Sequence, residues 1–165
     1  MNEHPHSTTT LPGTALEPGR VAADLVLVDP ASRDRVSLWD HRQRAAVVLA
    51  FLHAGCEACR AFARDLAAVT GELEWAGAVA RAVVPVPDDL AVSVLVDAGD
   101  VARRRLLDED AEVPVVVVLD RYGAAIESYP AAGHGFPTPT EIVAAVTHLA
   151  VQCPECGVSD WPDET

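Results

Sequence analysis

Two cysteines three residues apart, Cys56 and Cys59, are the residues of this chain with the clearest chemistry. They follow an apolar run at 46–52 that is typical of a buried strand. An apolar stripe at helical spacing comes after them, made of Phe62, Leu66, Val69 and Leu73. A thiol in the first turn of a helix faces unpaired backbone N–H groups and the positive end of the helix dipole, and both favour the thiolate.

A thiolate is the species that attacks a disulfide, and a second thiol nearby can displace the first from the mixed disulfide that forms. The spacing therefore indicates a redox dithiol. His53 could stabilise a thiolate on Cys56, or it could simply be the last side chain of the strand. Glu57 would repel that thiolate, whereas Arg60 would attract it.

A second pair, Cys153 and Cys156, lies in a Cys-Pro-Glu-Cys-Gly run near the C-terminus. This pattern is typical of a zinc knuckle, which supplies two of the four ligands that zinc requires. The other two could come from a second subunit, from His4 and His6, or from the first cysteine pair. Alternatively, the second pair could exchange electrons with the first, or have no function. The sequence leaves these possibilities open.

The composition limits the classes of function. The chain has 165 residues, of which 50% are hydrophobic, which is enough for one domain with a substantial core. Its formal net charge of −13 argues against nucleic acid and anionic membrane surfaces as partners. No apolar run approaches about 18 residues, and the N-terminus lacks the pattern of a signal peptide. We therefore expect a cytoplasmic protein, in which paired cysteines indicate redox chemistry or metal binding more than structural disulfides.

The hydrophobic pattern predicts strands that alternate with helices. The expected strands cover 21–28, 35–39, 46–52, 79–85, 91–96, 113–119 and 124–129. The expected helices cover 57–75, 101–107 and 139–151. We place a flexible tail at 1–20, a single domain at 21–151, and the second cysteine pair with its own tail at 152–165.

Local signals refine this outline. Asp100 is expected to cap the helix at 101–107. The run 138–141, Thr-Pro-Thr-Glu, predicts a capping box for the last helix, whose apolar stripe is Ile142, Val146 and Leu149. Trp39 and Trp75 are expected to pack against the core. His134, between two glycines, is expected to be a solvated loop residue.

The order of elements and four stretches of sequence resemble the thioredoxin-like redoxins, the branch that includes membrane-tethered disulfide reductases and alkyl-hydroperoxide-reductase-type proteins. The stretches are 36–40, 48–56, 113–120 and the hairpin at Gly123, and the resemblance covers about 21–150. It implies an α/β protein with the thioredoxin-like fold, in which helices flank a mixed central sheet. The strands before residue 40 would add an N-terminal β-hairpin extension.

The resemblance also implies roles for individual residues. Cys56 would be the exposed nucleophile and Cys59 the buried resolving thiol. Pro114 would be a cis-proline that, with Val113, holds an extended substrate strand. Without that resemblance an X–Pro bond is cis only about 5% of the time.

The chain departs from the thioredoxin pattern at two places, and it also lacks the peroxiredoxin signature. Ala54 stands where thioredoxins have a tryptophan, and Ala50 stands where they bury an aspartate. The proton acceptor for Cys59 is therefore missing or supplied elsewhere, with Glu57 as one candidate. The Thr or Ser that peroxiredoxins place three residues before their cysteine is absent, since His53 is there.

These observations predict a thiol–disulfide oxidoreductase that needs no organic cofactor. Its partners would be a disulfide-containing protein or small-thiol substrate and an upstream reductant, and the chain could form a homodimer. Two alternatives remain at this stage. The protein could be a thiol peroxidase, or a zinc-binding or redox-sensing module that works through Cys153 and Cys156.

Overall fold

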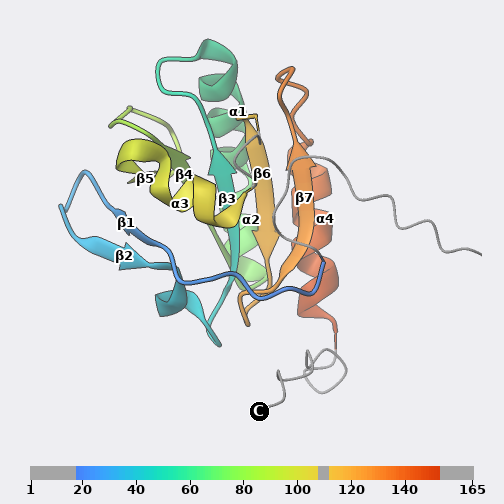
Figure 1. Ribbon diagram of the computed structural model, residues 1–165. Coiled ribbons are helices and arrows are strands. Elements are labelled where there is room, and N and C mark those ends of the chain that lie inside the picture. Colours follow the sequence, from blue (N-terminus) through green and yellow to red (C-terminus); the bar gives the residue numbers. More distant parts are fainter. Residues whose placement is uncertain (1–17, 108–111, 153–165) are drawn as a thin grey trace, which may run out of the picture.

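The computed structural model describes residues 18–107 and 112–152, which form a seven-stranded mixed sheet with helices on both faces (Figure 1). The strands are β1 (Val26–Val28), β2 (Arg35–Ser37), β3 (Ala46–Phe51), β4 (Ala78–Val84), β5 (Val94–Val96), β6 (Val115–Leu119) and β7 (Ala125–Pro130). Their order across the sheet is β2-β1-β5-β4-β3-β6-β7. The helices are α1 (Glu57–Ala68), α2 (Thr70–Trp75), α3 (Val101–Leu106) and α4 (Pro139–Ala150), with short 3-10 turns η1 (Leu38–His41) and η2 (Ala98–Asp100).

Strand β3 is buried on both faces, which explains why its sequence is an unbroken apolar run. Val47, Leu49 and Phe51 face one core, which also contains side chains of β1 and α3. The alternate residues of β3 face a second core, formed with α1, α2 and α4. Figure 1 shows α3 on one side of the sheet and α1, α2 and α4 on the other. The expected α/β architecture with a mixed sheet is confirmed.

The strand pairing brings four loops to one edge of the sheet. Strand β3 runs parallel to β4 and antiparallel to β6, and β6 runs antiparallel to β7. Phe51 at the end of β3 pairs with Val83 near the end of β4 and with Val115 at the start of β6. Val115 in turn pairs with Pro130 at the end of β7. The segments after β3, after β4, before β6 and after β7 therefore meet at this edge.

The N-terminal extension is a hairpin, as expected. Strands β1 and β2 pair antiparallel, and Val28 of β1 pairs with Val96 of β5, which attaches the hairpin to the sheet. Gly19 donates a backbone hydrogen bond to Ala125, and Val21 forms an isolated bridge with Ala124. No helix in the described ranges is both long and apolar enough to cross a membrane.

The predicted helix at 57–75 is divided at Val69, where φ is −104° and ψ is 7°. The break leaves the stripe intact, because Phe62, Leu66 and Leu73 are all buried and Val69 packs against the same core.

The capping box of α4 is present, as predicted. The Thr138 hydroxyl accepts from the Glu141 N–H, and the Glu141 carboxylate accepts from the Thr138 N–H.

The two tryptophan predictions are wrong. Trp75 is 87% exposed, because it is the last residue of α2 and lies off the stripe that Leu73 continues. Trp39 is 49% exposed, and the guanidinium of Arg42 lies over its ring, 4.9 Å from the centroid.

Asp100 is the N-cap residue of α3, as predicted, but its side chain makes no capping hydrogen bond. Gly99 and Asp100 both have positive φ, 75° and 56°, and this turn directs the buried carboxylate of Asp97 at the helix start instead. Its two oxygens accept from the backbone N–H groups of Ala102 and Arg103, each at 2.9 Å.

Replacing Asp97 with Ala should therefore lower the free energy of unfolding by about 1–2 kcal/mol, the usual effect of losing a side-chain cap. The measurement is urea unfolding followed by far-ultraviolet circular dichroism. The control is Asp65→Ala, which changes an exposed carboxylate on α1 and should alter stability by less than about 0.5 kcal/mol. Equal effects of the two substitutions would contradict the capping role.

Candidate active site

Cys56 and Cys59 lie at the start of α1, at the sheet edge where the four loops meet. Cys56 is the N-cap residue, with extended backbone angles, and Glu57 is the first residue of the helix. Cys59 lies one turn in and is fully buried, in the core that α1 shares with the sheet. Cys56 is only partly buried. The helix thus presents one thiol at the surface and holds the other inside.

The helix start lowers the pKa of Cys56. The main cause is the backbone N–H of Cys59, and the Cys59 thiol and the N–H of Ala58 add to it. Partial burial and the charge of Glu57 oppose the shift. The Cys56 sulfur makes no cap hydrogen bond of normal geometry, so these N–H groups act on it electrostatically.

The pKa of Cys59 moves the other way, to about 11. Burial is the largest cause, followed by hydrogen bonding to Cys56, the charge of Cys56 and the charge of Asp88. The backbone of His53 opposes this shift by hydrogen bonding to the Cys59 sulfur. Of the two thiols, Cys56 therefore loses its proton first and Cys59 retains its proton.

His134 lies beside Cys56, with its Nε2 atom 3.4 Å from the Cys56 sulfur. The residue is in the loop after β7, where its φ is 60° and its backbone N–H donates to Ala131 at 2.7 Å. It is exposed, as a solvated loop residue would be, but its contact with Cys56 was not anticipated. In the tautomer with hydrogen on Nε2, it donates to the sulfur and stabilises a thiolate.

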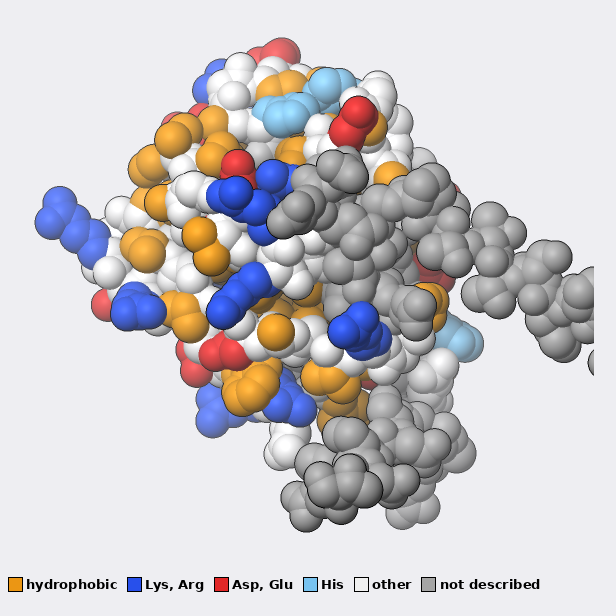
Figure 2. All heavy atoms as spheres, in the orientation of Figure 1, with side chains coloured by type: hydrophobic (Ala, Val, Ile, Leu, Met, Phe, Trp, Pro, Cys, Tyr) orange, Lys and Arg blue, Asp and Glu red, His pale blue; other side chains and the backbone are white. Residues whose placement is uncertain are grey.

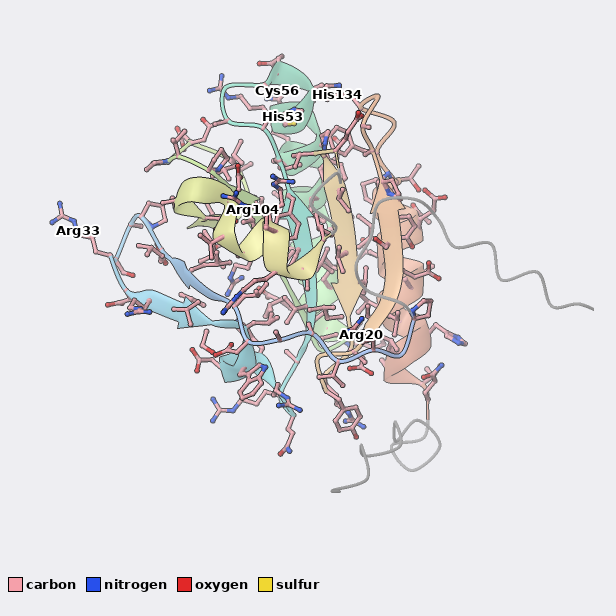
Figure 3. The ribbon with its side chains drawn as sticks, in the orientation of Figure 1. Arg20, Arg33, His53, Cys56, Arg104 and His134 are labelled. Carbon is pink, nitrogen blue, oxygen red and sulfur yellow. The ribbon has the colours of Figure 1, made fainter. Side chains whose placement is uncertain are left out.

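His53 completes a cluster of four side chains. One ligand atom from each of His53, Cys56, Cys59 and His134 lies within 4.8 Å of the other three. The rings of the two histidines have centroids 5.6 Å apart. Figure 3 shows His53, Cys56 and His134 together where α1 begins, and Figure 2 shows histidine side chains at the surface of this end of the molecule. The cluster is therefore open to solvent on one side.

Asp88 holds the loop that precedes Cys56. Its Oδ2 atom accepts from the Gly55 N–H at 2.8 Å, and its Oδ1 atom accepts from the Arg60 guanidinium at 3.0 Å. Both contacts lower the pKa of Asp88, the Gly55 N–H most strongly. Arg60, expected to attract the Cys56 thiolate, is thus paired with Asp88.

Glu57 faces solvent. Its carboxylate pairs with Arg64 at 3.2 Å, and the Glu57 side chain is 77% exposed. A proton acceptor for the buried Cys59 would have to lie inward, so Glu57 is poorly placed for the role suggested from sequence. The charge of Glu57 does raise the pKa of Cys56, but it is the smallest of the influences on that pKa.

Neither a protein-family model nor a curated protein sequence matches this chain. Solved structures do match. Peroxiredoxin Q of Xanthomonas campestris aligns with a TM-score of 0.65 and 19% identity, over 83% of this chain and 98% of its own. The exposed lipoprotein thioredoxin of Streptococcus pneumoniae aligns with a TM-score of 0.60 and 21% identity, over 77% of this chain and 100% of its own.

A third match is the thioredoxin domain of a thiol-disulfide oxidoreductase from Bacteroides vulgatus, with a TM-score of 0.55 and 18% identity, over 69% of this chain and 89% of that one. The fold is thioredoxin-like. At these identities the likeness shows the architecture alone.

Two features of this thioredoxin-like domain bear on the sequence predictions. The Val113–Pro114 peptide bond is cis, as predicted, and it lies directly before β6 at the edge that carries the dithiol. Pro114 is buried and its carbonyl accepts from the N–H of Ala131 at 2.8 Å, while Val113 is partly exposed.

Ala50 is fully buried among apolar neighbours, so the region where thioredoxins bury an aspartate is apolar here.

The predicted knuckle residues Cys153 and Cys156 lie outside the described residues. The described chain ends at Gln152, after α4, at the opposite end of the molecule from the start of α1 (Figure 1). The 12 residues of α4 separate its two ends by roughly 18 Å.

The pKa shift of Cys56 makes a prediction for alkylation. With Cys153 and Cys156 replaced by Ser and metal removed by a chelator, iodoacetamide should modify Cys56 with a pH midpoint below that of a free thiol. Cys59→Ala should raise this midpoint because it removes the thiol that hydrogen bonds to Cys56, and Glu57→Gln should lower it because it removes a repelling charge.

The rate is measured by mass spectrometry across pH. Asp65→Asn serves as the control, since it neutralises an exposed carboxylate elsewhere on α1 and should leave the midpoint unchanged. A midpoint that equals that of an unstructured cysteine peptide, or that ignores both substitutions at the site, would refute the assigned causes.

Proposed function

We propose that the protein is a thiol–disulfide oxidoreductase. The observation that carries the proposal is the difference between the two thiols. Cys56 is accessible, lies at a helix start and has a lowered pKa, while Cys59 is buried within reach of it and has a pKa of about 11. A nucleophile and a protected resolving thiol need these opposite properties.

In the first step the Cys56 thiolate attacks one sulfur of a substrate disulfide. A bond forms between Cys56 and that sulfur, the substrate S–S bond breaks, and the other substrate sulfur leaves as a thiolate that takes a proton. In the second step Cys59 loses its proton and attacks Cys56. The substrate leaves as a second thiol, and the protein holds a Cys56–Cys59 disulfide.

The two electrons gained by the substrate come from the dithiol, so an upstream reductant of thiol class must restore it. The redox potential sets the direction in the cell. The same steps in reverse would oxidise a substrate dithiol.

The imidazoles are suited to handle the proton of Cys59. Each ring has a nitrogen within 4.8 Å of the Cys59 sulfur, a distance that one bridging water can span for proton transfer. Asp88 is less suitable, because its contacts with Gly55 and Arg60 lower its pKa and make it a weak base. In this proposal His134 also stabilises the Cys56 thiolate before attack.

The substrate strand would lie along Val113 and Pro114, beside the start of β6. The open side of the cluster suits a disulfide on a protein surface or a small disulfide, and no enclosed pocket is needed to select it. We further propose that the protein acts in the cytoplasm. Zinc binding by Cys153 and Cys156, electron relay through them and dimer formation remain predictions from sequence.

Cysteine variants test the exchange mechanism. Cys56→Ser should abolish reduction of insulin disulfides with dithiothreitol as reductant, because no nucleophile remains. Cys59→Ser should accumulate a mixed disulfide with the substrate, detectable by mass spectrometry, because the resolving thiol is lost. Replacing Cys153 and Cys156 with Ser is the control and should leave this assay unchanged. Wild-type activity in Cys56→Ser would disprove the mechanism.

A peroxide assay on the same proteins separates exchange from peroxidase activity. Exchange predicts no consumption of hydrogen peroxide above that of the dithiol reductant alone. Peroxide consumption by the wild type, with a sulfenic acid on Cys56 in the Cys59→Ser variant, would instead support a peroxidase.

A third set of variants tests His134. His134→Asn should slow the attack of Cys56 on a small aromatic disulfide about tenfold, since a hydrogen bond to a charged group contributes about 1.5 kcal/mol. Asn suits this position because it tolerates positive φ better than other residues with a Cβ. The control is His148→Ala, an exposed residue on α4. An unchanged rate in His134→Asn, or an equal loss in His148→Ala, would show that the contact with Cys56 has no kinetic role.

A further inference from the structure

The cluster at the start of α1 contains a complete set of ligands for a transition metal. It has two thiols, Cys56 and Cys59, and two imidazoles, His53 and His134. The two cysteines come from α1 and its N-cap, His53 from the segment after β3, and His134 from the loop after β7. Two sulfur and two nitrogen donors in tetrahedral arrangement are typical of zinc.

The spacing of the donor atoms agrees with this geometry. Bonds of about 2.3 Å to sulfur and about 2.0 Å to nitrogen, at tetrahedral angles, place a sulfur and a nitrogen ligand about 3.5 Å apart. The Cys56 sulfur and His134 Nε2 are 3.4 Å apart. All four donor atoms lie within 4.8 Å of one another, so the longest separations would shorten by at most about 1.5 Å around an ion.

The surroundings allow this adjustment. His53 and His134 are exposed side chains in irregular segments, so small rotations can bring their nitrogens inward. Cys59 is held rigidly in the core and fixes one corner of the site. On the protein side, His134 also packs edge-on against Phe136, which itself stacks on Phe62 of α1.

We propose that the reduced protein binds one zinc ion through His53, Cys56, Cys59 and His134. Binding replaces the protons of the two thiols, which are released to solvent, and two thiolates neutralise the charge of the ion. Both imidazoles bind as neutral ligands. The site needs neither Cys153 nor Cys156, and so it differs from the knuckle expected near the C-terminus.

The oxidation state of the dithiol would control this site. A Cys56–Cys59 disulfide offers no thiolate, so only the reduced protein has the four ligands. Conversely, bound zinc occupies the lone pair with which Cys56 would attack a disulfide. Zinc should therefore hold the dithiol in a reduced, unreactive state until it is removed. The proposal requires reduced thiols but does not depend on the exchange activity.

The test uses the full chain with Cys153 and Cys156 replaced by Ser, which removes the other thiols. The reduced protein is titrated with zinc in the presence of a chromophoric chelator, and bound metal is counted by mass spectrometry under native conditions. We expect one zinc per reduced chain and none in the disulfide form. Cobalt(II) should give the intense visible bands of a tetrahedral site with thiolate-to-cobalt charge transfer. Absence of zinc from the reduced chain would overturn the proposal.

Histidine variants separate this site from binding by the thiols alone. His53→Ala and His134→Asn should each weaken zinc affinity by more than about tenfold, because even the loss of a group that only hydrogen bonds to a metal ligand typically costs about 10- to 100-fold. His148→Ala, remote on α4, should leave the affinity unchanged. Zinc affinity that survives both substitutions at the site, or that falls equally in His148→Ala, would refute the four-ligand assignment.

A second measurement leaves all four ligands in place and so does not depend on the folding of variants. Zinc should protect Cys56 from iodoacetamide at one ion per chain, and a chelator should restore its reactivity. Unchanged alkylation at saturating zinc would refute coordination by Cys56. The zinc titration does not require disulfide exchange. A protein that stays inactive after a chelator has removed its metal, but binds zinc when the ion is added back, would disprove the proposed function while supporting this site.

Discussion

The pairing of β3 with β4 on one side and β6 on the other is the constraint on which the site depends. The pairs that Phe51 makes with Val83 and Val115 bring three chain segments to the same edge, and the pairing of β6 with β7 adds a fourth. A shift of one residue in this register would move every apolar side chain of β3 to the wrong core. Because β3 is buried on both faces, such a shift is costly, and the positions of the loops that form the candidate site follow from core packing.

Burial then makes two equivalent side chains chemically different. Cys59 packs in the core beneath the sheet edge, where the charged form is unfavourable, while Cys56 stays at the helix end, where backbone N–H groups favour it. Ala50, where the sequence resemblance leads one to look for a buried aspartate, is fully buried in the same apolar cluster as Cys59. The polar groups near the sulfurs are instead His53 and His134, on surface segments. Proton transfer and metal binding would both use these exposed imidazoles.

Much of the fold could be predicted from local pattern. Continuous apolar runs predicted β3 and β6, and the capping box predicted the start of α4, because these signals depend on residues close together in the chain. Predictions failed where backbone angles that the residue pattern does not show decide the outcome. The N–H groups at the start of α3 are capped by Asp97 rather than Asp100, because two positive φ angles redirect the backbone. Trp75 is exposed because α2 ends there, with the helix broken at Val69.

By itself the sequence determined that a Cys-x-x-Cys pair starts a helix after a buried strand. The order of the elements resembles that of the thioredoxin-like redoxins, and this resemblance predicted the cis bond before Pro114. Only the tertiary structure decided what surrounds the sulfurs. His134 is 78 positions from Cys56 and Asp88 is 33 positions from Gly55, yet both contacts are direct. No local pattern encodes such contacts, because they arise from strand pairing, which brings loops together according to sheet register and not according to their separation in sequence.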